Sequence, residues 1–598
     1  MVDDEPKAKK WLSKPKFSKK YFTKRARKVE GATIRHAHKF IIKRWINVRE
    51  VQQHVIFWVL AIGFLIAASG LQLMWYQSSY QTIAPANKGT YAEAVLGPID
   101  TLNPLFAKTS AEQSASYLMF SRLMNYDRTG HLNYDIATDV KINDTKKVYT
   151  VSIRPDVKWH DGAKLTTQDI EFTINLMKNP NVRTVDYGWG GITTKVINDT
   201  TIEFTLPATY GAFEHFLTFP IVPKHKLGNV ASISIRENIF SQKPVGSGPF
   251  KINFIQNSEG KSGHKIIHMQ VNPDYYGGTP KLSSFQLHIY STTDQIIEAL
   301  SKSEVNAAAG ILSADISRVD TKRYTVSSEP IQSGVYALIN MKSPLLQDLN
   351  LRQALRSATN KNAIREKLPA KTPNLDLPFT QNQLIGDVPK APVFNQAVAN
   401  KLLDEGGWKM NSKNVRVKDG KQLKISVVTI KNSEFESVLE TLAGQWRSVG
   451  FSIDTKVIDP SDITQNVVQS ILQPRNFDVL LYQLNIGADP DVYAYWHSSQ
   501  VSPGGLNYSN YSNAISDDAL ISARSRIEPE LRNAKYITFA KQWLSDIPAI
   551  GLYQSTTEYV SGRTINSFDI TNYLVSPVDR YSDILNWSVG ERGVYKTP

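Results

Sequence analysis

The chain has 598 residues, too many for a single hydrophobic core, and its 41% hydrophobic and 21% charged residues are typical of a globular protein with several domains or lobes. It contains no cysteine, which excludes disulfides, cysteine metal sites, a thiol nucleophile and the lipid-bearing cysteine of a lipoprotein. Residues 1–53 hold 16 Lys/Arg and five acidic residues, so they supply +11 of the +14 net charge. The remaining chain is nearly neutral, which argues against a nucleic-acid partner.

An uncharged apolar segment follows the basic tail of residues 1–54. It runs from Val55 to Tyr76 and would form a helix about 33 Å long, enough to cross a bilayer core. Lys and Arg crowd its N-terminal side, so the positive-inside rule predicts a cytoplasmic tail and an extracellular or periplasmic body. The alternative is a signal peptide cleaved at Ala84-Pro85-Ala86, but the basic region is too long for one. We therefore expect a single-pass anchor at 55–76 and a polar tether at 77–89.

Strand-like and helix-like patterns alternate along the body and predict an α/β fold. Strands are expected at 90–96, 139–142 and 148–154, the last with the alternating pattern VYTVSIR. A tight turn follows at Trp159-His160-Asp161-Gly162. Thr166 can then cap a helix with Asp169 in a capping box, and Asn179-Pro180 ends that helix.

The His160-Asp161 pair raises the question of a catalytic or metal site. Neighbouring side chains in a turn point in different directions, and each polar residue here has a local structural role, so we interpret the stretch as scaffolding. The body contains no H-E-x-x-H, G-x-S-x-G or Walker sequence. His264 and His268 are four residues apart, but their surroundings indicate a turn and a strand rather than a helix with a metal site. The sequence predicts neither an enzyme nor a bound cofactor or metal.

Several motifs carry a resemblance to a known family. The chain contains, in this order, IDTLNPLF, TVSIRPDVKWHDGAKLTTQDIEFTI, PVGSGPFKI, VNPDYYGGTPKLSSFQLHIY, LNLRQALRSATNKNAI and AVANKLLDEGGW, before the late segment that starts at Asp517. In this order they resemble the peptide/nickel-type extracellular solute-binding proteins of ABC importers, from about Tyr91 to the C-terminus.

The resemblance implies a type II periplasmic-binding-protein fold, with two lobes around a cleft. We expect lobe 1 at 90–314 with an extra subdomain at about 128–222, lobe 2 at 315–558, and a return to lobe 1 at 559–598. It also implies that the body captures peptides and delivers them to ABC permease subunits, and we expect it to be a monomer. Another solute (a metal chelate or a sugar) and a peptide-signal receptor of the same fold are the alternatives.

The resemblance also suggests candidate ligand-binding residues. Many relatives hold the ligand amine with an Asp shortly before a D-P-D element, whereas this chain has Asn485 and Ile486 there. Asp489 or Asp491 could substitute, or could simply form a turn or helix cap. The other candidates could face the cleft or belong to the core: Tyr482, Trp496, Trp189, Tyr336 and Asn340.

Overall fold

The structure, a computed structural model, describes residues 28, 31–32, 34–35, 39 and 48–595, apart from 86–87, 185–187, 258–263, 370, 460–461, 463–465 and 568–573. Most of the predicted basic tail therefore lies outside the described residues. The chain forms two units, residues 1–84 with 593–598, and residues 85–592.

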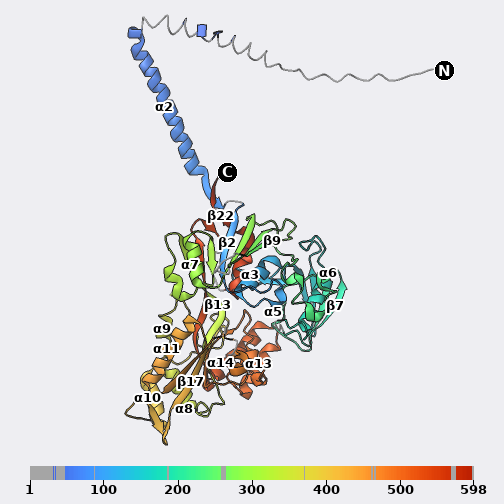
Figure 1. The fold of residues 1–598 in the computed structure, drawn as a ribbon, viewed down its shortest axis with the longest axis vertical. Coiled ribbons are helices and arrows are strands. Elements are labelled where there is room, and N and C mark those ends of the chain that lie inside the picture. Colours follow the sequence, from blue (N-terminus) through green and yellow to red (C-terminus); the bar gives the residue numbers. More distant parts are fainter. Residues whose placement is uncertain are drawn as a thin grey trace, which may run out of the picture. The chain divides into compact units, whose positions relative to one another are not determined.

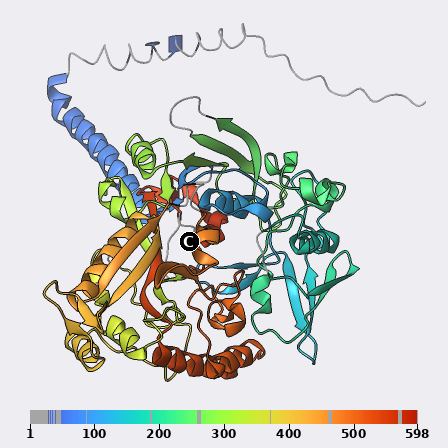
Figure 2. The ribbon, with the colours of Figure 1, turned by 60° about the horizontal axis from the view of Figure 1, so that its bottom comes forward.

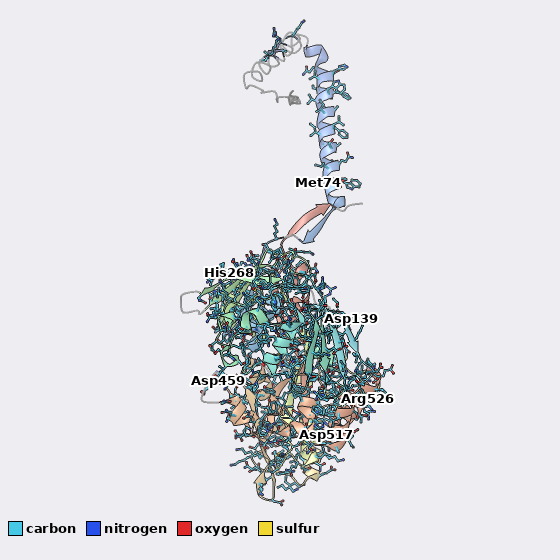
Figure 3. The ribbon with its side chains drawn as sticks, turned by 90° about the vertical axis from the view of Figure 1, so that its right-hand side faces the viewer. Met74, Asp139, His268, Asp459, Asp517 and Arg526 are labelled. Atoms are coloured by element: carbon cyan, nitrogen blue, oxygen red, sulfur yellow. The ribbon has the colours of Figure 1, made fainter. Side chains whose placement is uncertain are left out.

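The first unit contains the long apolar helix α2 (Val48–Tyr80), which extends beyond both ends of the predicted segment. Its stretch Gln52–Tyr76 is long and apolar enough to cross a membrane. The side chains of this stretch project outward, Met74 among them, with no protein covering them (Figure 3). The expected tether is partly structured, because β1 (Gln81–Pro85) follows the helix and pairs with β23 (Glu591–Tyr595).

A ten-stranded sheet runs through the second unit. Its spatial order is β18 (Ser452–Ile458), β17 (Lys424–Ile430), β19 (Val479–Asn485), β13 (Tyr324–Ile339), β20 (Ala549–Gly562), β12 (Ala307–Ala309), β2 (Thr90–Leu96), β11 (Ser284–Tyr290), β10 (Lys265–Val271) and β9 (Phe250–Asn257). The two longest strands, β13 and β20, pair antiparallel at its centre, with a register shift between Pro330 and Gly334. We refer to the part of the unit around β9–β12 as lobe 1 and to the part around β17–β19 as lobe 2.

Both faces of the lobe 2 sheet are covered, as the alternation of buried side chains along β13 shows. Val335, Ala337 and Ile339 pack in one core cluster, whereas Tyr336 and Leu338 pack in another on the opposite face. In Figure 1, α9–α11 and α13–α14 lie on opposite sides of these strands. The helices of lobe 2 are α8 (Leu349–Ala358), α9 (Lys361–Arg365), α10 (Gln396–Glu405), α11 (Ser433–Ser448), α12 (Tyr493–Trp496), α13 (Ala514–Arg524) and α14 (Pro529–Asp546), together with the short helices η7 (Val468–Leu472) and η8 (Ser498–Val501). A small sheet adds β14 (Lys409–Met410), β15 (Arg416–Lys418) and β16 (Lys421–Gln422).

Lobe 1 surrounds β2 and receives the C-terminal segment of the chain. Its elements include η3 (Pro104–Phe106), α3 (Ser110–Met119), β3 (Met124–Tyr126), β4 (Leu132–Tyr134), η4 (Ser232–Ser234), η5 (Ile239–Ser241), α7 (Thr293–Ser301), η6 (Ser313–Arg318), β21 (Ile565–Asn566), η9 (Pro577–Asn586) and β22 (Ser588–Val589). Arg580 of η9 donates to Glu93 of β2 at 2.5 Å, and both side chains are buried. Tyr581 and Tyr559 donate to the same carboxylate. This buried ion pair connects the chain end and β20 to the first strand of the body.

A subdomain, defined here as residues 137–227, projects from lobe 1 (Figure 2). It contains the sheet β5–β6–β8–β7 and helices α4–α6: β5 (Ala137–Ile142), β6 (Val148–Ile153), α4 (Thr167–Lys178), β7 (Thr193–Asn198), β8 (Thr201–Thr205), α5 (Phe213–Phe216) and α6 (Lys224–Leu227). The predicted capping box of Thr166 and Asp169 is present, and Asn179 ends α4 as expected.

The His160-Asp161 stretch is a structural turn, as the sequence predicts, with Gly162 at φ +88°. The Nδ1 atom of His160 accepts the backbone N–H of Gly246 at 3.2 Å, so the proton lies on Nε2 and is donated to the carbonyl of Gly248 at 3.1 Å. Asp161 points elsewhere and pairs with His225 at 2.8 Å. The His160 ring thus connects the subdomain to the segment before β9.

This geometry requires a neutral imidazole, and burial lowers the pKa of His160 to about 4. The unfolded chain therefore binds more protons between pH 6.5 and about 4, and the stability that this ring contributes is lost as the pH falls through that range.

We predict that His160→Ala lowers the free energy of unfolding by about 1–2 kcal/mol at pH 7.5, through two lost hydrogen bonds. The deficit should shrink toward pH 4.5, because the unfolded wild-type chain protonates His160 there whereas the folded protein keeps the ring neutral. Denaturant unfolding of both proteins across this range measures it, with the exposed His131→Ala as a control. A deficit that grows at low pH would contradict the neutral-ring geometry.

Candidate functional site

The loop after β19 carries two carboxylates that meet side chains from both lobes. Oδ2 of Asp491 accepts the Tyr210 hydroxyl at 2.8 Å and Nε of Arg524 at 2.9 Å. Tyr210 belongs to the subdomain of lobe 1, whereas Arg524 ends α13 of lobe 2. The Arg524 guanidinium also lies 4.9 Å from the centre of the Tyr210 ring. Asp491 is therefore part of a contact between the lobes, at a distance from the paired strands β13 and β20.

Asp489 forms the second half of this contact. Its two oxygens accept the Arg532 guanidinium at 2.6 and 2.7 Å, a two-pronged pair in which the side chains are only 10% and 12% exposed. Nε2 of His215, from α5 of the subdomain, lies 3.8 Å from the same carboxylate. In Figure 1, α5 lies above α13 and α14, and Arg532 belongs to the first turn of α14. We call the set Tyr210, His215, Asp489, Asp491, Arg524 and Arg532 the interlobe contact.

Both candidate acids are thus already neutralised by arginine. Asn485 and Ile486, where the resemblance suggested an amine-binding Asp, offer no carboxylate either: the Asn485 side chain accepts the Ser333 hydroxyl at 2.9 Å, and Ile486 is buried. A ligand ammonium placed here would have to compete with a guanidinium for Asp489 or Asp491.

The aromatic candidates pack mainly against protein. Trp496 and Tyr336 are buried in one core cluster, with ring centres 6.2 Å apart, and the Tyr336 hydroxyl donates to the Leu377 carbonyl at 3.0 Å. Tyr482 is half-buried and lies edge-on to Tyr508, with ring centres 5.7 Å apart.

Two further candidates are also buried. Asn340 donates its amide to the carbonyls of Arg475 and Phe477, at 3.2 and 3.0 Å, and so holds a turn of lobe 2. Trp189 lies in an aromatic cluster of the subdomain, edge-on to Phe216 and Phe219. The structure therefore places Trp189 one layer behind these two phenylalanines, which line the cavity described next.

A cavity of about 420 Å³ lies in lobe 1 beside the interlobe contact. It is bounded by η3, α3, β3, α5 and the start of η9, and its walls mix aromatic with polar groups. The Tyr126 hydroxyl and Nδ1 of His215 form a hydrogen bond of 2.8 Å on its wall, and the other nitrogen of His215 faces Asp489. The lining residues are Pro104, Ala107, Gln113, Ser116, Tyr117, Arg122, Asn125, Tyr126, His215, Phe216, Thr218, Phe219, Pro220, Val575, Ser576, Val578 and Asp579.

Arg122 is the single Lys or Arg among these lining residues, and it is only 8% exposed. Its guanidinium lies 4.4 Å from the centre of the Tyr117 ring. The hydrogen bond that Arg122 donates to Asp135 comes from its backbone N–H and not from the side chain. Among the described residues the guanidinium has neither a hydrogen-bond acceptor nor an acidic group within 4 Å, so a buried cation faces the cavity without a direct partner.

Asp579 supplies the negative charge of the cavity. One of its oxygens accepts the backbone N–H and the hydroxyl of Ser576, at 2.6 and 2.8 Å, which caps η9. Burial raises the pKa of Asp579 to about 6. Burial also lowers the pKa of His215, although Asp489 partly opposes this effect. Asp579 therefore changes its charge under mildly acidic conditions.

The sequence analysis missed Arg122, Tyr126, His215 and Asp579. Arg122 left a usable signal, since it stands alone in the apolar stretch YLMFSRLM, where a buried cation requires an explanation. Asp579 left none, because it is brought to α3 from more than four hundred residues along the chain.

We predict that Asp579→Asn stabilises the protein near neutral pH. The folded protein binds more protons than the unfolded chain between pH 3.8, the ordinary pKa of this carboxyl, and about 6, so the contribution of Asp579 to stability is lost as the pH rises through that window. The variant, which retains an oxygen for Ser576, should gain up to about 3 kcal/mol over wild type at pH 7.5 relative to pH 4. Denaturant unfolding at both pH values tests this, and a difference that does not change with pH would refute it.

Comparison with known proteins connects this geometry to a family. Residues 131–505 match the family model described as "Bacterial extracellular solute-binding proteins, family 5 Middle". The chain is 27% identical over 515 residues to the oligopeptide-binding protein AppA of Bacillus subtilis, covering 83% of this chain and 91% of that protein. It is 25% identical over 459 residues to a putative ABC transporter peptide-binding protein of Brucella ovis, covering 75% and 83%.

Solved structures share the fold. The structure of AppA from Bacillus subtilis in complex with a nonapeptide superposes with a TM-score of 0.70 at 23% identity, covering 85% of this chain and all of that one. NikZ from Campylobacter jejuni, in complex with Ni(L-His), gives 0.71 at 23% identity and covers 83% and 99%. These relatives are substrate-binding proteins rather than enzymes. With the family model matching more than half of its length, the chain belongs to family 5 of the bacterial extracellular solute-binding proteins, the peptide/nickel-type binding proteins of ABC transporters.

Proposed function

We propose that this protein captures peptides in a cleft between lobes 1 and 2 and delivers them to the permease subunits of an ABC transporter. The observation that carries the proposal is the 420 Å³ cavity of lobe 1, which borders the contact made by Asp489 and Asp491 of lobe 2. A ligand in this cavity would lie beside groups from both lobes, and its binding would favour the closed arrangement. The similarity to AppA supports a peptide as the ligand.

The proposed lobe boundaries follow the central strands. We propose lobe 1 at 90–314, lobe 2 at 315–558, and a return to lobe 1 at 559–598. The subdomain at 137–227 lies close to the range of about 128–222 expected from the sequence. β20 supports this division because it crosses the boundary at residue 559, pairing with β13 of lobe 2 and, through Tyr559–Ser561, with β12 of lobe 1. The buried pair of Arg580 with Glu93 supports the return.

We further propose that α2 anchors the body to the outer face of a cell membrane. The apolar stretch Gln52–Tyr76 and the +11 charge of residues 1–53 support this orientation. Such an anchor would keep the body near its permease in the same membrane.

A protease added to intact cells should digest the body and spare the basic tail, because only the body would be exposed. Immunoblots against an epitope at each end measure the outcome. Permeabilised cells, in which both ends should be digested, serve as the control. Recovery of a mature form that begins near Asn87 would show cleavage and contradict the anchor.

We predict that peptide binding needs no free N-terminus. Asp489 is committed to Arg532 and Asp491 to Arg524, so an ammonium would enter the site without a free anion, which costs several kcal/mol for a buried charge. Calorimetry on residues 88–598 with free and N-acetylated pentaalanine should give equal affinities within about threefold, or a preference for the acetylated form.

Asn485→Asp is the matched variant for this experiment. Residue 485 is exposed at the end of β19, so the change adds a carboxylate without breaking an ion pair. The Asn485→Asp variant should bind the free peptide more tightly than the N-acetylated one. A strong preference of wild type for the free amine would contradict the hypothesis that the site lacks a free carboxylate for it. Failure to bind any peptide, with binding of a metal chelate or a sugar instead, would overturn the peptide assignment.

A further inference from the structure

The most unusual group in the cavity is Arg122, a buried cation that has no ion-pair or hydrogen-bond partner for its guanidinium within the part of the chain that the structure describes. Burial of an arginine is unfavourable unless its charge is compensated. The carboxylates that influence it from a greater distance are both committed elsewhere. Asp135 accepts the Arg122 backbone N–H and the Tyr276 hydroxyl, and Asp579 accepts two hydrogen bonds from Ser576. The guanidinium N–H groups are therefore available to a molecule in the cavity.

The chemistry of the walls limits what that molecule can be. A guanidinium presents parallel N–H donors that match the two oxygens of a carboxylate or a phosphate. Because Arg122 is the one Lys or Arg of the lining and Asp579 lies in the same cavity, a doubly charged phosphate would meet too little positive charge. A single carboxylate balances Arg122, and the aromatic walls of Tyr117, Phe216 and Phe219 can cover the carbon atoms that carry it.

We propose that Arg122 is the receptor for a ligand carboxylate, so that the cavity selects peptides by an anionic end or side chain rather than by their amine. This inference rests on the proposed peptide-binding function and deepens it. The 420 Å³ volume is near the lower end for ligand sites and suits one end of a peptide. The α-carboxylate and an acidic side chain offer the same chemistry, and the experiment separates them.

The test compares three probes by calorimetry on residues 88–598: pentaalanine, its C-terminal amide, and the amide with glutamate as its last residue. In wild type the plain amide should bind roughly 10- to 100-fold more weakly than pentaalanine, because a charged hydrogen-bonded pair is lost. Full recovery with the glutamate amide would show that any carboxylate suffices, and no recovery would assign the α-carboxylate. Equal binding of all three probes would overturn the proposal.

Arg122→Met is the decisive variant. It should remove the preference for the carboxylate by the same 10- to 100-fold. The melting temperature should change little, because the cost of burying the Arg122 charge disappears together with its attraction to Asp135 and Asp579. Arg122→Lys should restore only part of the preference for the carboxylate, since it keeps the positive charge but loses the two parallel N–H donors of the guanidinium. Arg236→Met is the matched control, an exposed arginine that lies over the Phe106 ring in the same lobe. A lower melting temperature with unchanged probe affinities would instead assign Arg122 a packing role on Tyr117.

A separate probe distinguishes this inference from the peptide assignment. If none of the peptides binds, thermal shifts with millimolar N-acetylalanine and N-acetylalanine amide decide the question. Suppose that N-acetylalanine raises the melting temperature of wild type, that the amide does not, and that Arg122→Met abolishes this effect. Arg122 would then still be a carboxylate receptor, although the peptide assignment would fail. The absence of a shift by either compound would overturn both.

Discussion

The antiparallel pairing of β13 with β20 is the constraint on which the rest of the body depends. Tyr324–Pro330 pairs with Thr556–Gly562 on the side of β12 and lobe 1, and Gly334–Leu338 pairs with Ala549–Gln554 within lobe 2. Between these halves the register shifts, and the Gln332 N–H donates to the Leu574 carbonyl instead of to β20. Two continuous strands thus fix the lobes at one edge, while the interrupted ladder is the natural place for a bend.

The charges of the interlobe contact and of the cavity have complementary roles. Asp489 and Asp491 each face an arginine of their own lobe, so their charge is balanced before lobe 1 approaches. Tyr210 and His215 can then contact Asp491 and Asp489 without leaving a buried charge unpaired. Arg122 is different, because among the described residues its guanidinium has no direct ion-pair or hydrogen-bond partner. We therefore propose that the first set serves closure and that Arg122 serves ligand selection.

Local patterns predicted local structure well. The capping box at Thr166, the end of α4 at Asn179 and the structural turn at His160 are all confirmed, because neighbouring residues determine each of them. The candidate residues Trp496, Tyr336 and Trp189 show the limit, since an aromatic residue at a cleft and one behind it have the same sequence pattern. The cavity itself depends on α3, α5 and η9 meeting in space, which no local pattern records. Only Arg122, isolated in an apolar stretch, pointed to it.

The central claim is that a peptide closes the two lobes around the cavity, and a distance measurement between the lobes tests it most directly. The chain has no cysteine, so Lys195→Cys on β7 and Asp518→Cys on α13 give one exposed spin label in each lobe without further changes. Pulsed electron paramagnetic resonance should show that saturating pentaalanine shifts the distribution to shorter and narrower distances. A distribution that is identical with and without bound peptide would contradict closure on the ligand.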